Sequence, residues 1–202
     1  MLKHNNRTSI ATIAQRLKRA GRSAVPALWL LSDELRLKDP RAAIAALPRG
    51  AGFIFRHYGL PNREQLGREL RQHCRQHRIL FSVAGDTRLA ARLRADGVHL
   101  PQGLAHHAIA ARQRNHNWLI TVSAHDQSSM FRAATSGADA ILLSPVFATA
   151  SHPDAKPLGP LHFALLARLV KIPVIALGGI TAANARRIQG ASGIAAISAL
   201  GV

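Results

Sequence analysis

The chain has 202 residues, 48% of them hydrophobic and 4% aromatic, so it can form one large domain or two small ones, with helices packed on strands rather than an all-β sandwich. Its single cysteine, Cys74, excludes an internal disulfide framework, and no apolar run is long enough to cross a bilayer, so a soluble cytoplasmic protein is expected. The 27 Lys and Arg residues against ten Asp and Glu give a formal net charge of +17, which attracts phosphate groups.

The first segment, residues 1–24, is basic and contains no acidic residue. It lacks the apolar core and the cleavage signal of a secretory peptide. We therefore expect a basic helical extension that precedes the first strand and belongs to a single domain spanning residues 1–202.

From residue 27 onward, short apolar runs alternate with amphipathic stretches such as 63–77 and 161–170. The apolar runs show little alternation, which is typical of parallel strands buried on both faces. They lie at 27–32, 52–57, 79–84, 97–101, 118–124, 140–146, 173–178 and 193–199. Eight strand–helix units predict a compact (β/α)₈ barrel, a form of α/β fold; a doubly wound open sheet is the rival, for which the units are short.

The sequence stops soon after the eighth predicted strand, so the helix that usually closes the ring is expected to be missing. Part of one strand would then lack a cover on its outer face. Either the N-terminal helix or a second subunit would cover it, which makes a homodimer a possible assembly.

In such a barrel the chemistry lies at the carboxyl ends of the strands. Gly178 and Gly179 follow the seventh strand, where glycine allows a left-handed backbone and close approach of main-chain amides to a ligand. A helix predicted to begin after them would add its positive end, and Ser198 and Ala199 would add amides after the eighth strand. The sequence thus predicts a phosphate cradle, with a plain tight turn as the alternative.

Other polar residues end neighbouring strands. Ser123 and His125 stand two residues apart after the fifth strand and should face the same side. His125 is a candidate general acid/base, or else caps the next helix. Arg56 ends the second strand and is a candidate anion contact. The loop after the sixth strand carries Thr149 and His152 and is either a lid over a polar substrate or a solvated loop.

Several segments together carry a family resemblance: "GVHLPQ", "TVSAHD", "GADAILLSPVFATASH", "IPVIALGGITAANARRI" and "GIAAISAL". In this order they resemble the thiamine phosphate synthase/TenI family, from about residue 27 to residue 200. The resemblance implies a (β/α)₈ barrel acting in thiamine biosynthesis. It also implies roles for single residues: pyrimidine contact for Ser123 and Thr149, diphosphate contact for Arg56, and a thiazole-phosphate cradle for Gly178, Gly179, Ser198 and Ala199. Gln102 keeps its place in the family pattern, and His152 replaces a lid lysine.

The departures from the synthase pattern concern its magnesium and diphosphate end. Ala84 and Gly85 stand where the family has Asn-Asp, and Leu104 replaces the Asp of Gly-Gln-x-Asp. Mg²⁺ needs carboxylate or phosphate oxygens, which these residues do not supply. The pattern is closer to the TenI branch, a thiazole tautomerase that needs neither Mg²⁺ nor any other cofactor and in which His125 would shuttle a proton.

Two other functions stay open. The chain is a thiamine phosphate synthase if Asp86 or Asp154 holds Mg²⁺ at a shifted place, or it is a barrel that binds a phosphorylated ligand without catalysis. Nucleic-acid binding is the least favoured interpretation, because aromatic residues are few, no DNA-reading motif occurs and the arginines are scattered along the chain. The expected ligand is a small thiazole phosphate.

Overall fold

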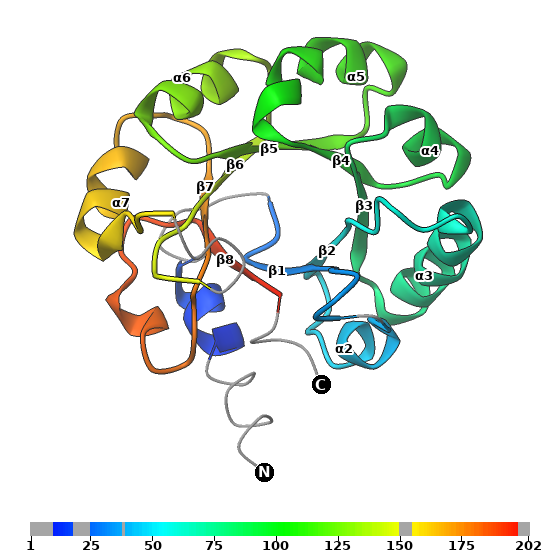
Figure 1. Cartoon of the computed structure of the whole chain (residues 1–202), viewed down its shortest axis with the longest axis horizontal. Coiled ribbons are helices and arrows are strands. Elements are labelled where there is room, and N and C mark those ends of the chain that lie inside the picture. The colour runs from blue at the N-terminus through cyan, green and yellow to red at the C-terminus, as the bar shows by residue number, and fades with distance from the viewer. Residues whose placement is uncertain (1–9, 18–24, 38, 150–154, 198–202) are drawn as a thin grey trace.

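The computed structural model describes residues 10–17, 25–37, 39–149 and 155–197. Eight parallel strands form a closed barrel in chain order, β1 beside β2 and so on until β8 pairs with β1 (Figure 1). The strands are β1 (Leu28–Leu31), β2 (Gly52–Phe55), β3 (Leu80–Ala84), β4 (Gly97–Leu100), β5 (Leu119–Ala124), β6 (Ala140–Leu143), β7 (Val174–Leu177) and β8 (Gly193–Ala196). The predicted barrel and each of its strands are confirmed, with the ends of several strands shorter than expected.

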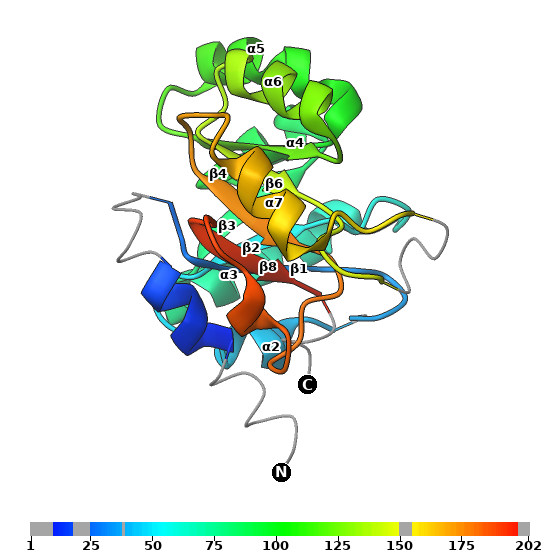
Figure 2. The ribbon, with the colours of Figure 1, turned by 90° about the vertical axis from the view of Figure 1, so that its left-hand side faces the viewer.

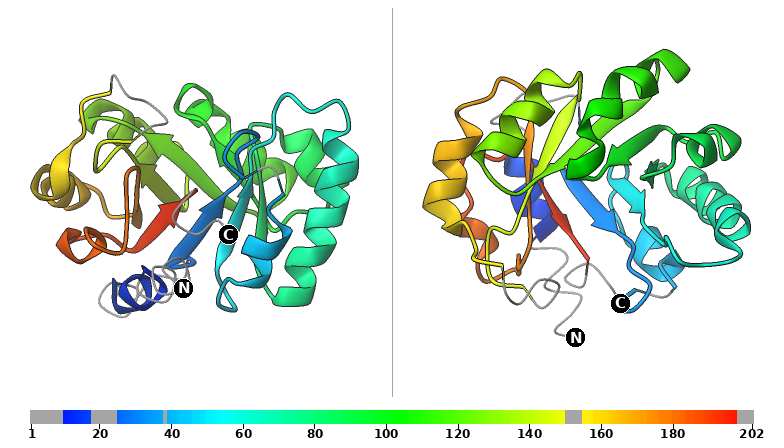
Figure 3. Two further views of the ribbon diagram at one scale, coloured as in Figure 1. Left: turned by 60° about the horizontal axis from the view of Figure 1, so that its bottom comes forward. Right: turned by 45° about the horizontal axis from the view of Figure 1, so that its top comes forward.

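The helices form a ring outside the strands (Figures 1 and 3). They are α2 (Arg41–Ala45), α3 (Arg63–His77), α4 (Thr87–Arg92), η1 (Gln102–His107), α5 (Ala108–Arg114), α6 (Gln127–Thr135), α7 (Gly159–Ala167) and η2 (Ala185–Arg187), of which η1 and η2 are 3₁₀ helices. One buried cluster fills the space between the strands and this ring, because alternate residues of each strand point outward.

The other strand residues point inward and fill the barrel. Trp29, Leu31, Ile54, Leu142 and Ile175 form part of this inner cluster. The Trp29 ring packs directly on Gly52, and only glycine fits there, because a Cβ at this position would lie 2.3 Å from the ring. Its indole N–H donates to the carbonyl oxygen of Pro26 at 2.8 Å, which satisfies the one polar atom of the buried side chain.

Of the predicted N-terminal extension, residues 10–17 are described, and they are helical. Ile10, Ile13 and Ala14 are buried in the same cluster as the outward-facing strand residues. Figures 1 and 2 show this helix against the side of the barrel near β8. The helix therefore covers apolar surface where the sequence left a choice between it and a second subunit.

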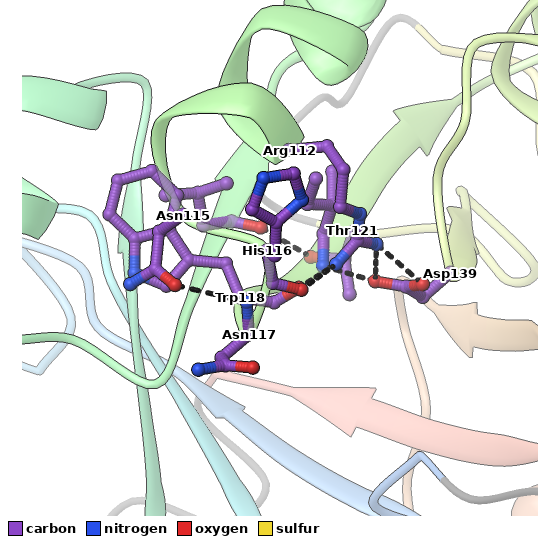
Figure 4. A network of polar contacts seen from close by, with 9 residues as sticks. Arg112, Asn115, His116, Asn117, Trp118, Thr121 and Asp139 are labelled. Atoms are coloured by element: carbon purple, nitrogen blue, oxygen red, sulfur yellow. Dashed lines mark hydrogen bonds and ion pairs between the residues drawn. The ribbon is translucent and has the colours of Figure 1, made fainter.

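Two arginine–aspartate clamps hold the turns at the amino ends of the strands. Arg112 of α5 donates two hydrogen bonds to the carboxylate of Asp139 (2.7 and 2.6 Å), which also accepts the N–H of Ile120 (Figure 4). Arg71 of α3 binds Asp96 in the same two-pronged way, at 2.9 and 2.8 Å. The first pair joins α5 to the turn before β6, and the second joins α3 to the turn before β4. Both pairs therefore stabilise the end of the barrel at which the strands begin.

The prediction that an α-helix begins after Gly179 is wrong. The backbone N–H of Thr181 donates to the side-chain oxygen of Asn184 (2.8 Å), and the Asn184 amide donates to the carbonyl oxygen of Gly179 (2.8 Å). These side-chain bonds compete with helical ones, so the segment forms turns and the single 3₁₀ turn η2. No helix of the described residues is long and apolar enough to span a membrane.

Candidate active site

His125 lies at the carboxyl end of β5, where its side chain is exposed at the mouth of the barrel. Its Nδ1 is 2.9 Å from the carbonyl oxygen of Ser144 and 3.1 Å from the Ser144 hydroxyl, just beyond β6. A carbonyl oxygen only accepts, so Nδ1 carries the proton and donates. The neutral ring then has its lone pair on Nε2, the arrangement that a general base needs.

The backbone around His125 is fixed by the start of α6. Asp126, not His125, is the N-cap: its carboxylate accepts the N–H of Ser129 at 2.7 Å, which holds the pKa of that carboxyl below its ordinary value. The Ser129 hydroxyl in turn accepts the N–H of His125 at 3.0 Å. The alternative in which His125 caps this helix is therefore wrong.

A second histidine lies deeper in the barrel and holds Ser123. The Nδ1 of His99 is 2.9 Å from the Thr121 hydroxyl, and its Nε2 is 2.9 Å from the Ser123 hydroxyl. Burial, with a smaller effect of the Arg56 charge, lowers the pKa of His99 to about 3. The ring is therefore neutral and links the two hydroxyls. The sequence alone does not reveal this contact between His99 and the site residue Ser123.

Arg56 follows β2 and is half-buried. Its backbone N–H donates to the hydroxyl of Ser32 at 2.8 Å. Its positive charge helps to lower the pKa of His99. Burial raises the pKa of Tyr58, and the charges of Arg56 and Arg63 reduce that rise. The charge of Arg56 therefore reaches His99, which is hydrogen-bonded to Ser123.

Gly178 and Gly179 follow β7 with φ of +98° and +62°. A Cβ on Gly178 would lie 2.8 Å from Pro145, and one on Gly179 would lie 2.3 Å from the carbonyl oxygen of Ala148. The loop after β6 packs on them, with the N–H of Phe147 donating to the Gly178 carbonyl at 3.1 Å. Both glycines are therefore required by backbone conformation and close packing, and their role as a phosphate cradle stays a prediction.

At the tip of β3 lies the guanidinium group of Arg63, which comes from α3, whereas a metal site there would need acidic side chains. The guanidinium of Arg63 donates to the carbonyl oxygen of Ala84 at 2.8 Å and lies 3.8 Å from the carboxylate of Asp86. Asp86 is already the N-cap of α4 and accepts the N–H of Leu89 at 2.8 Å. Within the described part of the chain, no three His, Cys, Asp or Glu residues converge in a way that could hold a metal ion.

The structure thus joins the tips of β4, β5, β6 and β7. The remaining predicted site residues are placed in part. Gln102 begins η1, and its side-chain oxygen is buried with no hydrogen-bond partner among the described residues; Thr149 is half-buried. His152, Ser198 and Ala199, together with Asp154, lie outside the described residues.

The chain is similar in sequence and in structure to proteins of one family. The family model of thiamine monophosphate synthase, TMP-TENI, matches residues 32–200. A putative thiamine-phosphate synthase 2 of Aquifex aeolicus is 38% identical over 181 residues, 86% of this chain and 97% of that protein. A thiamine-phosphate synthase of Lysinibacillus sphaericus is 39% identical over 141 residues, 68% of this chain and 66% of that protein.

Among solved structures, a thiamine phosphate pyrophosphorylase from Pyrococcus furiosus superposes with a TM-score of 0.74 at 31% identity, covering 87% of each chain. The matches extend through the strand tips described above. The chain therefore belongs to the thiamine monophosphate synthase (TMP-TENI) family.

Proposed function

We propose that this chain acts on a thiazole phosphate as a tautomerase and that His125 moves the proton. The single observation that supports this most is the Nδ1 bond of His125 to the Ser144 carbonyl, which leaves the Nε2 lone pair at an exposed position of the barrel mouth. The same carbonyl would stabilise the imidazolium that forms when Nε2 takes a proton.

In the proposed step Nε2 removes a proton from a ring carbon of a non-aromatic thiazole, and the electron pair of that C–H bond moves into the ring. The imidazolium returns the proton at the other end of the conjugated system. Proton and electrons balance, so neither an oxidant nor a second substrate is required. The amides at Gly178 and Gly179 would hold the phosphate, with Ser123 and Arg56 contacting the rest of the ligand.

The second candidate is a thiamine-phosphate synthase, a transferase, and it is favoured by the names of the relatives. That reaction involves Mg²⁺ on a diphosphate, and the described residues at the mouth do not fit this ion. Asp86 caps α4 beside Arg63, and Ala84 and Gly85 provide no side-chain oxygen. We derive no step through the metal for this chain.

Two assays on the purified protein separate these functions. The first follows conversion of the non-aromatic thiazole carboxylate phosphate to its aromatic tautomer without Mg²⁺; the second follows thiamine phosphate formation from pyrimidine diphosphate and thiazole phosphate with Mg²⁺. We expect turnover in the first, reduced about 100-fold or more in His125→Gln. His116→Gln, which alters an exposed histidine in the turn before β5, is the control and should keep full activity.

Each other result has a clear meaning. Magnesium-dependent product in the second assay alone would establish the synthase. Binding of thiazole phosphate without turnover in either assay would leave a non-catalytic ligand-binding barrel. Full tautomerase activity in His125→Gln would remove His125 from the mechanism. The proposal further expects the protein to work in the cytoplasm.

A further inference from the structure

We infer that the face of the barrel opposite the mouth binds the phosphate backbone of double-helical nucleic acid. The face is defined by Arg49, Arg78, Arg94 and Arg114, which we call the basic arc. Each lies in the turn, or at the helix end, that precedes one of four successive strands, β2, β3, β4 and β5. All are exposed, and within the described part of the chain none pairs with a carboxylate.

The fold brings together residues that are scattered along the sequence. The amino ends of parallel strands meet at one end of a barrel, so the turns before β2 to β5 are neighbours. Direct bonds join them: the N–H of Gly50 donates to the carbonyl oxygen of Arg78 at 3.0 Å, and the N–H of Leu119 donates to that of Asp96 at 3.0 Å. Arg71 spans the gap between, donating from Nε to the carbonyl oxygen of Arg94 at 3.0 Å.

The carboxylates at this end are already neutralised inside the protein. Asp96 and Asp139 are held by the two-pronged bonds of Arg71 and Arg112, as Figure 4 shows for the second pair. Each also accepts a strand N–H. Their charge is therefore not available to offset the basic arc, which faces solvent as an uncompensated row of guanidinium groups.

Backbone conformation gives an independent reason to expect a use for the side chains of two of these arginines. Arg78, the C-cap of α3, and Arg94, the residue after the C-cap of α4, have φ of +57° and +49°, in the left-handed region that glycine occupies most easily. At the other left-handed positions of the described chain the residue is glycine. Stability alone would favour glycine at both positions, so the exception indicates another use for these two guanidinium groups.

The chemistry of the arc fits a duplex backbone better than other polyanions. Guanidinium groups bind phosphate oxygens in pairs, and neighbouring turns lie on the order of 5–10 Å apart, since strands are about 4.8 Å and helices about 8–10 Å apart. The aromatic residue of these turns, Trp118, is buried and offers no stacking surface for single-stranded bases. The large exposed apolar side chains lie in other segments, so these turns lack a membrane anchor.

The test measures binding of the full chain to a fluorescent DNA duplex and to an RNA hairpin over a range of salt concentrations. We expect the logarithm of the association constant to fall with the logarithm of the salt concentration at a slope of about −3 to −4, as about four phosphate contacts predict. In the double variant Arg78→Gly/Arg94→Gly the salt dependence should become shallower by about 2 in slope, and binding at low salt should weaken tenfold or more. Its unfolding temperature should stay unchanged or rise, because glycine suits both positions.

The matched control is Arg88→Ala/Arg132→Ala, which removes the same charge from exposed helix positions outside the arc and should leave the slope unchanged. Comparison of the DNA and RNA arms shows which duplex is preferred. The proposal is overturned if neither duplex binds, if the control weakens binding as much as the double glycine variant, or if polyglutamate or anionic phospholipid vesicles compete as well as the duplexes.

Discussion

The buried ring of His99 makes the stability of this protein depend on pH in a way that can be calculated. Its pKa is about 3 in the folded protein against an ordinary value of 6.5, chiefly because burial disfavours the charged ring. Below about pH 6.5 the unfolded chain takes up a proton that the folded chain does not. The contribution of this residue is thus complete above pH 6.5 and is lost as pH falls toward 3.

The size of the effect follows from 1.36 kcal/mol per pH unit. Between about pH 7.5 and about pH 5 the loss from His99 is about 2 kcal/mol. Urea denaturation at both pH values would measure it in the wild type and in His99→Gln, whose amide can still bond the Thr121 and Ser123 hydroxyls but does not titrate. The wild type should lose about 2 kcal/mol more than the variant. Equal losses in the two proteins would refute a neutral, buried His99.

Three further outcomes test other parts of the structure. Gly179→Ala places a Cβ 2.3 Å from the Ala148 carbonyl oxygen at a φ of +62°, and calorimetry should show a loss of about 2–4 kcal/mol; an unchanged unfolding temperature would contradict the close packing. Arg112→Met leaves the Asp139 carboxylate without its two-pronged partner, and both side chains are about one third exposed. The free energy of unfolding measured with urea should therefore fall by about 1–3 kcal/mol, and an unchanged value would argue against the clamp. Cys74 is fully buried and its pKa is raised to about 12 by burial, so a thiol reagent at about pH 8 should label the unfolded chain rapidly and the folded chain hardly at all; rapid labelling of the folded chain would contradict its burial.

The strands could be predicted from the sequence because a parallel strand buried on both faces is a continuous apolar run, as in Ala140–Leu143 and Val174–Leu177. Helix α3 could be predicted from its amphipathic repeat. The segment after Gly179 has helix-forming residues, but Asn184 bonds the backbone of Thr181 and Gly179, a contact that composition does not reveal.

For the site, spacing along the chain predicted that Ser123 and His125 lie at the carboxyl end of β5, where the structure has them; their roles stay predictions. The partners of these residues come from other strands: His99 from β4 and Ser144 from the end of β6. Contacts between residues about 20 positions apart leave no local signal in one sequence. The arginines of the basic arc show the same limit, since only the closed barrel places their turns side by side.

The most direct test of the proposed function is a crystal structure of the protein with bound thiazole phosphate. We predict the phosphate at the amides of Gly178 and Gly179 and the thiazole ring within hydrogen-bonding reach of His125 Nε2. A phosphate bound at the tips of β2 and β3, or a ring turned away from His125, would contradict it.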